Sequence, residues 1–145
     1  MPEVAPIDQA SVWRKGSYKT TRPEFERIVA AAGMPTNRFT VVPGFFAESL
    51  SDETRERLSG KKAAVVYIDC DLYESTVPVL NFVRDFLQQG TIIIFDDWNT
   101  LFGDPGRGER RAWREFRERH PLLEFEDFVH TAMQKAFVHV GSRQR

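Results

Sequence analysis

The sequence predicts an α/β fold whose sheet is mostly parallel and ends in an antiparallel β-hairpin. Apolar runs alternate with amphipathic segments along most of the chain, which is typical of a parallel sheet with right-handed helical crossovers. The runs at 63–68 and 91–95 are unbroken, as expected of strands covered on both faces. Runs 122–129 and 136–140 lie too close in the chain for a parallel crossover, so they should pair as a hairpin.

The composition fits one soluble domain. The chain has 145 residues, of which 41% are hydrophobic and 28% charged. A net charge of −1, the lack of a long apolar run and the lack of a signal-peptide core predict a cytoplasmic protein that binds neither nucleic acid nor membrane. Cys70, the single cysteine, excludes an internal disulfide and should be a buried, unreactive thiol.

The first elements are an arm and an amphipathic helix. Residues 1–20 are polar and irregular, so we expect an extended N-terminal arm, followed by a single domain over residues 21–145. Thr21 opens a capping box for a helix that Gly33 ends. Its apolar residues recur at helical spacing: Phe25, Ile28, Val29 and Ala32.

A short strand and a short helix come next. Residues 39–42 read Phe-Thr-Val-Val, which predicts a strand. Gly44, Phe45 and Phe46 should follow it in a loop, at the sheet edge where the later parallel strands also end. Ser51 caps a short, mostly polar helix.

Two longer helices occupy the second half. The helix between the two apolar runs should be capped by Ser75 or Thr76, with Pro78 in its first turn. A helix that ends before Pro121 follows the second run. Its inward residues should be Ala112, Trp113 and Phe116. His139 alternates within the last run and is predicted to lie at the surface or in an interface.

Aspartates follow both apolar runs. Asp69 ends the first run, and Asp96 and Asp97 follow the second. Parallel neighbouring strands would place them at the edge where open α/β sheets bind ligands. A hard divalent cation would remove the repulsion among three carboxylates. Each aspartate could instead cap a loop or helix, as Asp71 could, but the set favours a metal or ligand site.

Three segments carry a resemblance to a known family: Val66–Thr76, Gly90–Trp98 and Gly108–Phe116. In order and spacing they resemble the macrocin/mycinamicin/novobiocin sugar O-methyltransferases, which are S-adenosylmethionine-dependent class I enzymes. The similarity covers roughly residues 38–140. It implies a partial Rossmann-like class I methyltransferase sheet and Mg²⁺-dependent methyl transfer to a hydroxyl of a sugar or similar small acceptor.

The resemblance also implies roles for residues. Asp69, Asp96 and Asp97 match the metal-binding carboxylates of the family, and Asp69 matches the position proposed as general base. The metal would lower the pKa of the acceptor hydroxyl and orient it toward the methyl group. Leu72 stands where catechol-type methyltransferases place a lysine, so that route of proton removal is absent.

One part of the family pattern is missing. Class I methyltransferases hold the cofactor on a glycine-rich turn after their first strand, and no such turn precedes Asp69. By the order of its motifs, the chain lacks the first two strands of the family. Only the adenine side of the cofactor site would remain, at Gly44, Phe45 and Phe46. Whether the chain is an enzyme therefore stays open, and a catalytically inactive remnant or assembly partner is the alternative.

The missing strands have a structural consequence. The family's strand order is 3-2-1-4-5-7-6, so without strand 1 the strand that ends at Asp69 becomes an apolar edge. We expect either that residues 39–42 pair with it or that a second copy covers it in a homo-oligomer.

A less favoured alternative is a phosphatase of the haloacid-dehalogenase type. The segment Asp69–Tyr73 resembles its Asp-x-Asp-x-Thr motif, and Asp96 with Asp97 resembles its metal-binding pair. Tyr73 replaces the phosphate-binding threonine, and a single helix between the motifs leaves no room for the other elements of that family.

Overall fold

The computed structural model describes residues 20–142, so the predicted arm lies almost wholly outside the described residues. Its elements are α1 (Arg22–Ala31), η2 (Thr36–Arg38), α2 (Phe46–Ser49), α3 (Asp52–Arg57), β1 (Val65–Ile68), α4 (Tyr73–Val83), η3 (Arg84–Phe86), β2 (Ile92–Phe95), α5 (Gly108–Arg119), β3 (Leu123–His130) and β4 (Lys135–Ser142). The strands form one sheet in the order β1-β2-β4-β3. β1 and β2 are parallel, whereas β2-β4 and β4-β3 are antiparallel. The α/β class and the C-terminal hairpin are thus confirmed.

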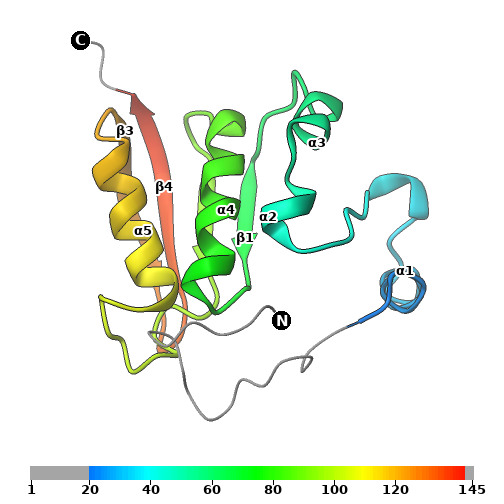
Figure 1. The fold of residues 1–145 in the computed structure, drawn as a ribbon, viewed down its shortest axis with the longest axis horizontal. Coiled ribbons are helices and arrows are strands. Elements are labelled where there is room, and N and C mark those ends of the chain that lie inside the picture. Colours follow the sequence, from blue (N-terminus) through cyan, green and yellow to red (C-terminus); the bar gives the residue numbers. More distant parts are fainter. Residues whose placement is uncertain (1–19, 143–145) are drawn as a thin grey trace.

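The core lies between the sheet and two helices. Figure 1 shows α4 and α5 side by side over one face of the sheet. The predicted inward face of α5 is confirmed, since Ala112, Trp113 and Phe116 are buried. They join buried strand residues in a single cluster that includes Ile68, Ile93, Phe95 and Phe137. Burial of each large side chain is worth about 1.5–3 kcal/mol, so this cluster fixes the strand ends that carry the aspartates.

Among the described residues, no element covers the face of β1 that points away from α4 and α5. Val65 and Tyr67 are 57% and 54% exposed, so the prediction that this strand is covered on both faces is wrong. Successive side chains of a strand point to opposite faces, and α4 and α5 cover only one of them.

The predicted strand at 39–42 does not form, and its predicted pairing with β1 is therefore wrong as well. A four-residue segment followed by Pro43 needs a ladder partner to offset the cost of ordering it, and none lies beside it in residues 20–142. Within residues 20–142, β1 is therefore an edge strand, and the sheet has one parallel pair of strands and two antiparallel pairs.

The first helix forms as predicted but packs little. The Thr21 side chain accepts a hydrogen bond from the backbone N–H of Glu24 at 3.4 Å, as a capping box requires. However, no residue of α1 is buried, and Phe25 and Ile28 are 44% and 50% exposed. Figure 1 shows α1 apart from the sheet. At α3, Ser51 caps the helix as predicted, accepting from the N–H of Thr54 at 3.3 Å.

Three local predictions need correction. Phe46 begins the short helix α2 and does not lie in a loop. The helix α4 begins at Tyr73, so Ser75 and Thr76 lie inside it and do not cap it, and Pro78 falls beyond the first turn. The chain turns at Asp71, which has φ +54°. Because of this turn, α4 begins before Ser75 and Thr76, the residues predicted to cap it.

The prediction that His139 lies at the surface or in an interface is also wrong. It is only 4% exposed, and its Nδ1 lies 2.9 Å from the carbonyl oxygen of Glu124, beside the ring of Phe125. A register shift between Glu124 and Phe125 brings this imidazole inside the hairpin, which the alternation of the sequence does not reveal. Within residues 20–142, no helix has the length and apolar character needed to cross a bilayer.

Candidate functional site

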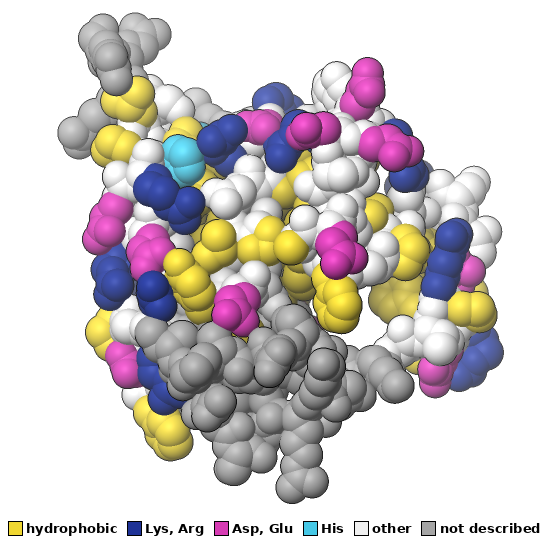
Figure 2. Space-filling model, viewed as in Figure 1, with side chains coloured by type: hydrophobic (Ala, Val, Ile, Leu, Met, Phe, Trp, Pro, Cys, Tyr) yellow, Lys and Arg dark blue, Asp and Glu magenta, His cyan; other side chains and the backbone are white. Residues whose placement is uncertain are grey.

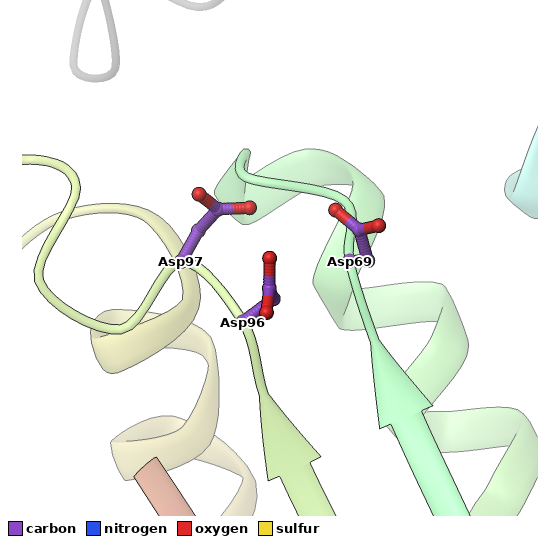
Figure 3. A group of neighbouring side chains, drawn as sticks. All are labelled: Asp69, Asp96 and Asp97. Atoms are coloured by element: carbon purple, nitrogen blue, oxygen red, sulfur yellow. The ribbon is translucent and has the colours of Figure 1, made fainter. Parts of the chain in front are cut away.

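Three aspartates meet at the carboxyl ends of β1 and β2. The last residues of the two strands, Ile68 and Phe95, are paired in register, so the residues that follow them are neighbours. One carboxylate oxygen from each of Asp69, Asp96 and Asp97 lies within 4.8 Å of the others. Figure 3 shows the three carboxyl groups around a common space, with Asp69 coming from one strand and the other two from the next. The structure thus brings together the three residues predicted from the sequence.

Two carboxyl groups of this cluster, those of Asp69 and Asp97, resist ionisation. Partial burial, with the charges of Asp96 and Asp97, raises the pKa of Asp69. Burial and a hydrogen bond to Asp71 raise the pKa of Asp97 to about 7. The Thr100 hydroxyl, which donates to Asp97 Oδ1 at 2.7 Å, acts in the opposite direction and lowers this pKa. A cation among these oxygens would offset both effects, and three carboxylate oxygens are a donor set that suits Mg²⁺.

Two further residues orient Asp96. The hydroxyl of Tyr67 and the side-chain amide of Gln134 both donate to Asp96 Oδ1. The Gln134 amide also lies 3.3 Å from the Tyr67 hydroxyl. The bond to Asp96 raises the pKa of Tyr67 to about 12, so the phenol stays a donor at neutral pH. Neither Tyr67 nor Gln134 was predicted from the sequence. Tyr67 lies in β1 two positions before Asp69, and the alternation of side chains along a strand could have indicated that both lie on the same side.

Glu109 connects the two loops that carry the aspartates. It is only 1% exposed, and its Oε2 accepts from the backbone N–H of Asp97 at 3.1 Å. The backbone of Cys70 also hydrogen-bonds to this carboxyl group. Burial, followed by the charge of Asp97, raises the pKa of Glu109 to about 9. Glu109 was not predicted from the sequence either, although an acidic residue in the first turn of the helix after β2 could have indicated it.

The start of α5 fits tightly against the loop after β1. Gly108 has φ +50°, and a Cβ at this position would lie 2.9 Å from the backbone oxygen of Asp71 and 2.8 Å from Leu101 Cδ1. Only glycine allows this approach at low cost. The contact places Glu109 between the two loops.

The predicted cofactor residues lie outside the aspartate cluster. Gly44 has φ +118°, Phe45 is 54% exposed, and Phe46, which begins α2, is 40% exposed. The helix α2 packs against α4. The two exposed rings offer flat apolar surfaces, which is what an adenine ring stacks on. Between residue 20 and Asp69, no glycine-rich turn follows a strand that could hold the rest of the cofactor.

Residues 7–132 match the family model described as Macrocin-O-methyltransferase (TylF). Among solved structures, the chain is similar to the O-methyltransferase NovP, with 20% identity and a TM-score of 0.66 over 83% of this chain and 46% of that one. It is also similar to CalS11, a calicheamicin methyltransferase, with 23% identity and a TM-score of 0.71 over 95% and 56% of the two chains. The apo structure of CalS11, a TDP-rhamnose 3'-O-methyltransferase, gives 23% identity and a TM-score of 0.55 over 80% and 50%.

The chain therefore spans about half the length of these solved structures. At such identities they show the fold alone. A search of curated proteins found no match.

Proposed function

Because the chain belongs to the macrocin-O-methyltransferase family, we propose that it acts in Mg²⁺-dependent methyl transfer from S-adenosylmethionine to a hydroxyl of a small acceptor. The observation that carries this proposal is the convergence of Asp69, Asp96 and Asp97, with oxygens within 4.8 Å of one another. A sugar is the proposed acceptor, since one solved neighbour is named for TDP-rhamnose. A cytoplasmic location is part of the proposal.

In this proposal the three aspartates hold the cation. Bound Mg²⁺ would supply Lewis-acid chemistry that lowers the pKa of an acceptor hydroxyl. Tyr67 and Gln134 fix the carboxyl group of Asp96, and Thr100 fixes that of Asp97. Oriented ligands of this kind reduce the reorganisation that binding requires.

Asp69 is proposed to take up the proton of the acceptor hydroxyl. Asp69 is exposed, whereas Asp96 and Asp97 are half-buried, so an incoming acceptor can reach it. Gly44, Phe45 and Phe46 are proposed to contact the adenine of the cofactor, and the described residues supply no more of the cofactor site than that side.

Titration calorimetry with S-adenosylmethionine, with and without Mg²⁺, tests this proposal. We expect micromolar binding, because the family uses this cofactor. Phe45→Ser should weaken it, whereas Phe102→Ser, which removes a still more exposed ring from another loop, should not. Absence of binding at millimolar cofactor would favour the alternative, an inactive partner that keeps the aspartates without holding the cofactor.

A further inference from the structure

A groove runs between α5 and the hairpin strand β3, beside the aspartate cluster. Its volume is about 640 Å³, which is in the range of small-molecule sites. The helix α5 leads away from the end of the sheet that carries the aspartates, and β3 returns toward it. Trp98, which directly follows Asp97, lines the groove together with Lys135, so one end of it adjoins the aspartate cluster.

The groove combines an aromatic floor with a cationic rim. Trp98, Trp113 and Phe137 line it as apolar surfaces. Four cationic side chains line it against two carboxylates: Arg110, Arg114, Arg117 and Lys135 against Glu118 and Asp127. In a chain with a net charge of −1, this is a local excess of positive charge. Figure 2 shows dark-blue side chains over α5 at the left of the molecule, next to yellow ones.

The three arginines follow one helix face. Positions 110, 114 and 117 are spaced by four and three residues, so they stand in a row along about 10 Å of α5. A row of guanidinium groups suits an elongated anion with more than one charge, since each can bind phosphate oxygens through two parallel N–H groups.

Lys135 and Arg110 already have partners within the protein, whereas the Arg117 side chain has none among the described residues. The Lys135 ammonium pairs with Asp127 at 2.6 Å. The Arg110 guanidinium donates to Asn99 Oδ1 at 3.1 Å and lies 5.4 Å from the centre of the Trp98 ring, which orients it at the aspartate end. Within residues 20–142, no ion pair or hydrogen bond involves the Arg117 guanidinium, which is therefore available to bind a ligand.

We propose that this groove binds a phosphate-bearing small molecule with a ring system, of the nucleoside diphosphate class. Its phosphates meet the row of Arg110, Arg114 and Arg117, and a sugar ring lies against Trp98. In combination with the proposed function, on which this step rests, the groove is the acceptor subsite, and it presents a hydroxyl of that sugar to the neighbouring aspartates.

Calorimetric titration with uridine diphosphate, in EDTA and without S-adenosylmethionine, tests the groove by itself. EDTA removes divalent cations that would carry the nucleotide to the aspartates. We expect saturable binding that weakens with added salt. Arg117→Gln should weaken it about tenfold through the loss of one charge-assisted contact. The matched control is Arg57→Gln on α3, which lies outside the groove and should leave binding unchanged.

Two further ligands identify the chemistry. Uridine, which lacks phosphate, and benzoate, which offers a carboxylate on a ring, should each bind at least about tenfold more weakly than the diphosphate. Equal binding of all three, equal behaviour of the two arginine variants, or no binding of the diphosphate would overturn the proposal. The diphosphate titration contains neither metal nor cofactor, so it is independent of the titration with S-adenosylmethionine. If the diphosphate binds and S-adenosylmethionine does not, only the proposed methyl transfer is refuted. If S-adenosylmethionine binds and the diphosphate does not, only the proposed groove site is refuted.

Discussion

Glu109 shows how a single side chain can set the geometry of a site without belonging to its ligand set. Its carboxyl group accepts backbone N–H groups from the loop after each of the two parallel strands. Asp97 is one of these partners and Cys70, next to Asp69, is the other. The carboxyl group therefore fixes the separation of the two loops and, through them, that of the aspartates.

Removing this carboxyl group should loosen the cluster. We predict that Glu109→Ala weakens Mn²⁺ binding, measured by electron paramagnetic resonance, about 10- to 100-fold, as loss of an outer-shell partner does. Glu109→Gln keeps an oxygen that accepts the same N–H groups and should retain most of the affinity. Glu118→Ala removes an exposed carboxylate from the same helix and serves as the control. Unchanged Mn²⁺ affinity in Glu109→Ala, with an intact fold, would show that Glu109 does not position the aspartates.

The ligand set could be predicted from the sequence, whereas its supporting residues could not. Asp69, Asp96 and Asp97 follow two apolar runs, and parallel pairing brings such positions together. Gln134 reaches Asp96 from the turn between β3 and β4. Its position depends on the antiparallel pairing of β2 with β4, which no local pattern of the sequence encodes.

At the scale of elements, periodicity predicted which helices form but not which are covered. The apolar stripes of α1 and α5 look alike in sequence, yet α1 buries none of its residues and α5 buries a large part of its face. The segment 39–42 has strand-forming residues but no neighbour to pair with. Local propensity is a property of the segment, whereas burial and pairing depend on what lies beside it.

This difference between helices predicts a difference in stability. Ile28→Ser on α1 should change the free energy of unfolding by less than about 0.5 kcal/mol, because the side chain is half exposed. Leu80→Ala on α4 should cost about 2–5 kcal/mol, because Leu80 is fully buried in the core. Urea unfolding followed by circular dichroism measures both. Comparable losses in the two variants would mean that α1 is packed in solution.

At the scale of the whole molecule, β1 leaves an open edge and an exposed apolar face. Its outer side has no strand beside it among the described elements, and Val65 and Tyr67 are largely exposed. An apolar, unpaired edge of this kind favours association. We therefore keep the prediction that a second copy covers it.

Sedimentation equilibrium measures this association directly. The chain should sediment as a dimer or larger assembly, and Val65→Lys should shift it toward the monomer by placing a charge on the edge strand. Thr40→Lys, outside the sheet, should leave the assembly intact. A monomeric parent chain at micromolar concentration would contradict the prediction.

The clustered carboxyl groups also make the stability of the whole fold depend on pH. The pKa values of Asp97 and Glu109 are raised to about 7 and about 9, above those of an unfolded chain. Between about pH 6 and about pH 9 the folded chain thus holds protons that the unfolded chain releases, so stability must fall as pH rises. The melting temperature in EDTA should decrease across this range. A melting temperature that rises from about pH 7 to about pH 9 would contradict these raised pKa values.

We expect the three aspartates that follow β1 and β2 to bind one divalent cation. Calorimetric titration with Mg²⁺ near pH 8, where Asp97 is mostly ionised, tests it most directly. We predict one site per chain, lost in Asp69→Asn and in Asp97→Asn but kept in Asp104→Asn, which alters a carboxylate of the following loop outside the cluster. Absence of Mg²⁺ binding, or equal binding in all three variants, would show that these aspartates do not form a cation site.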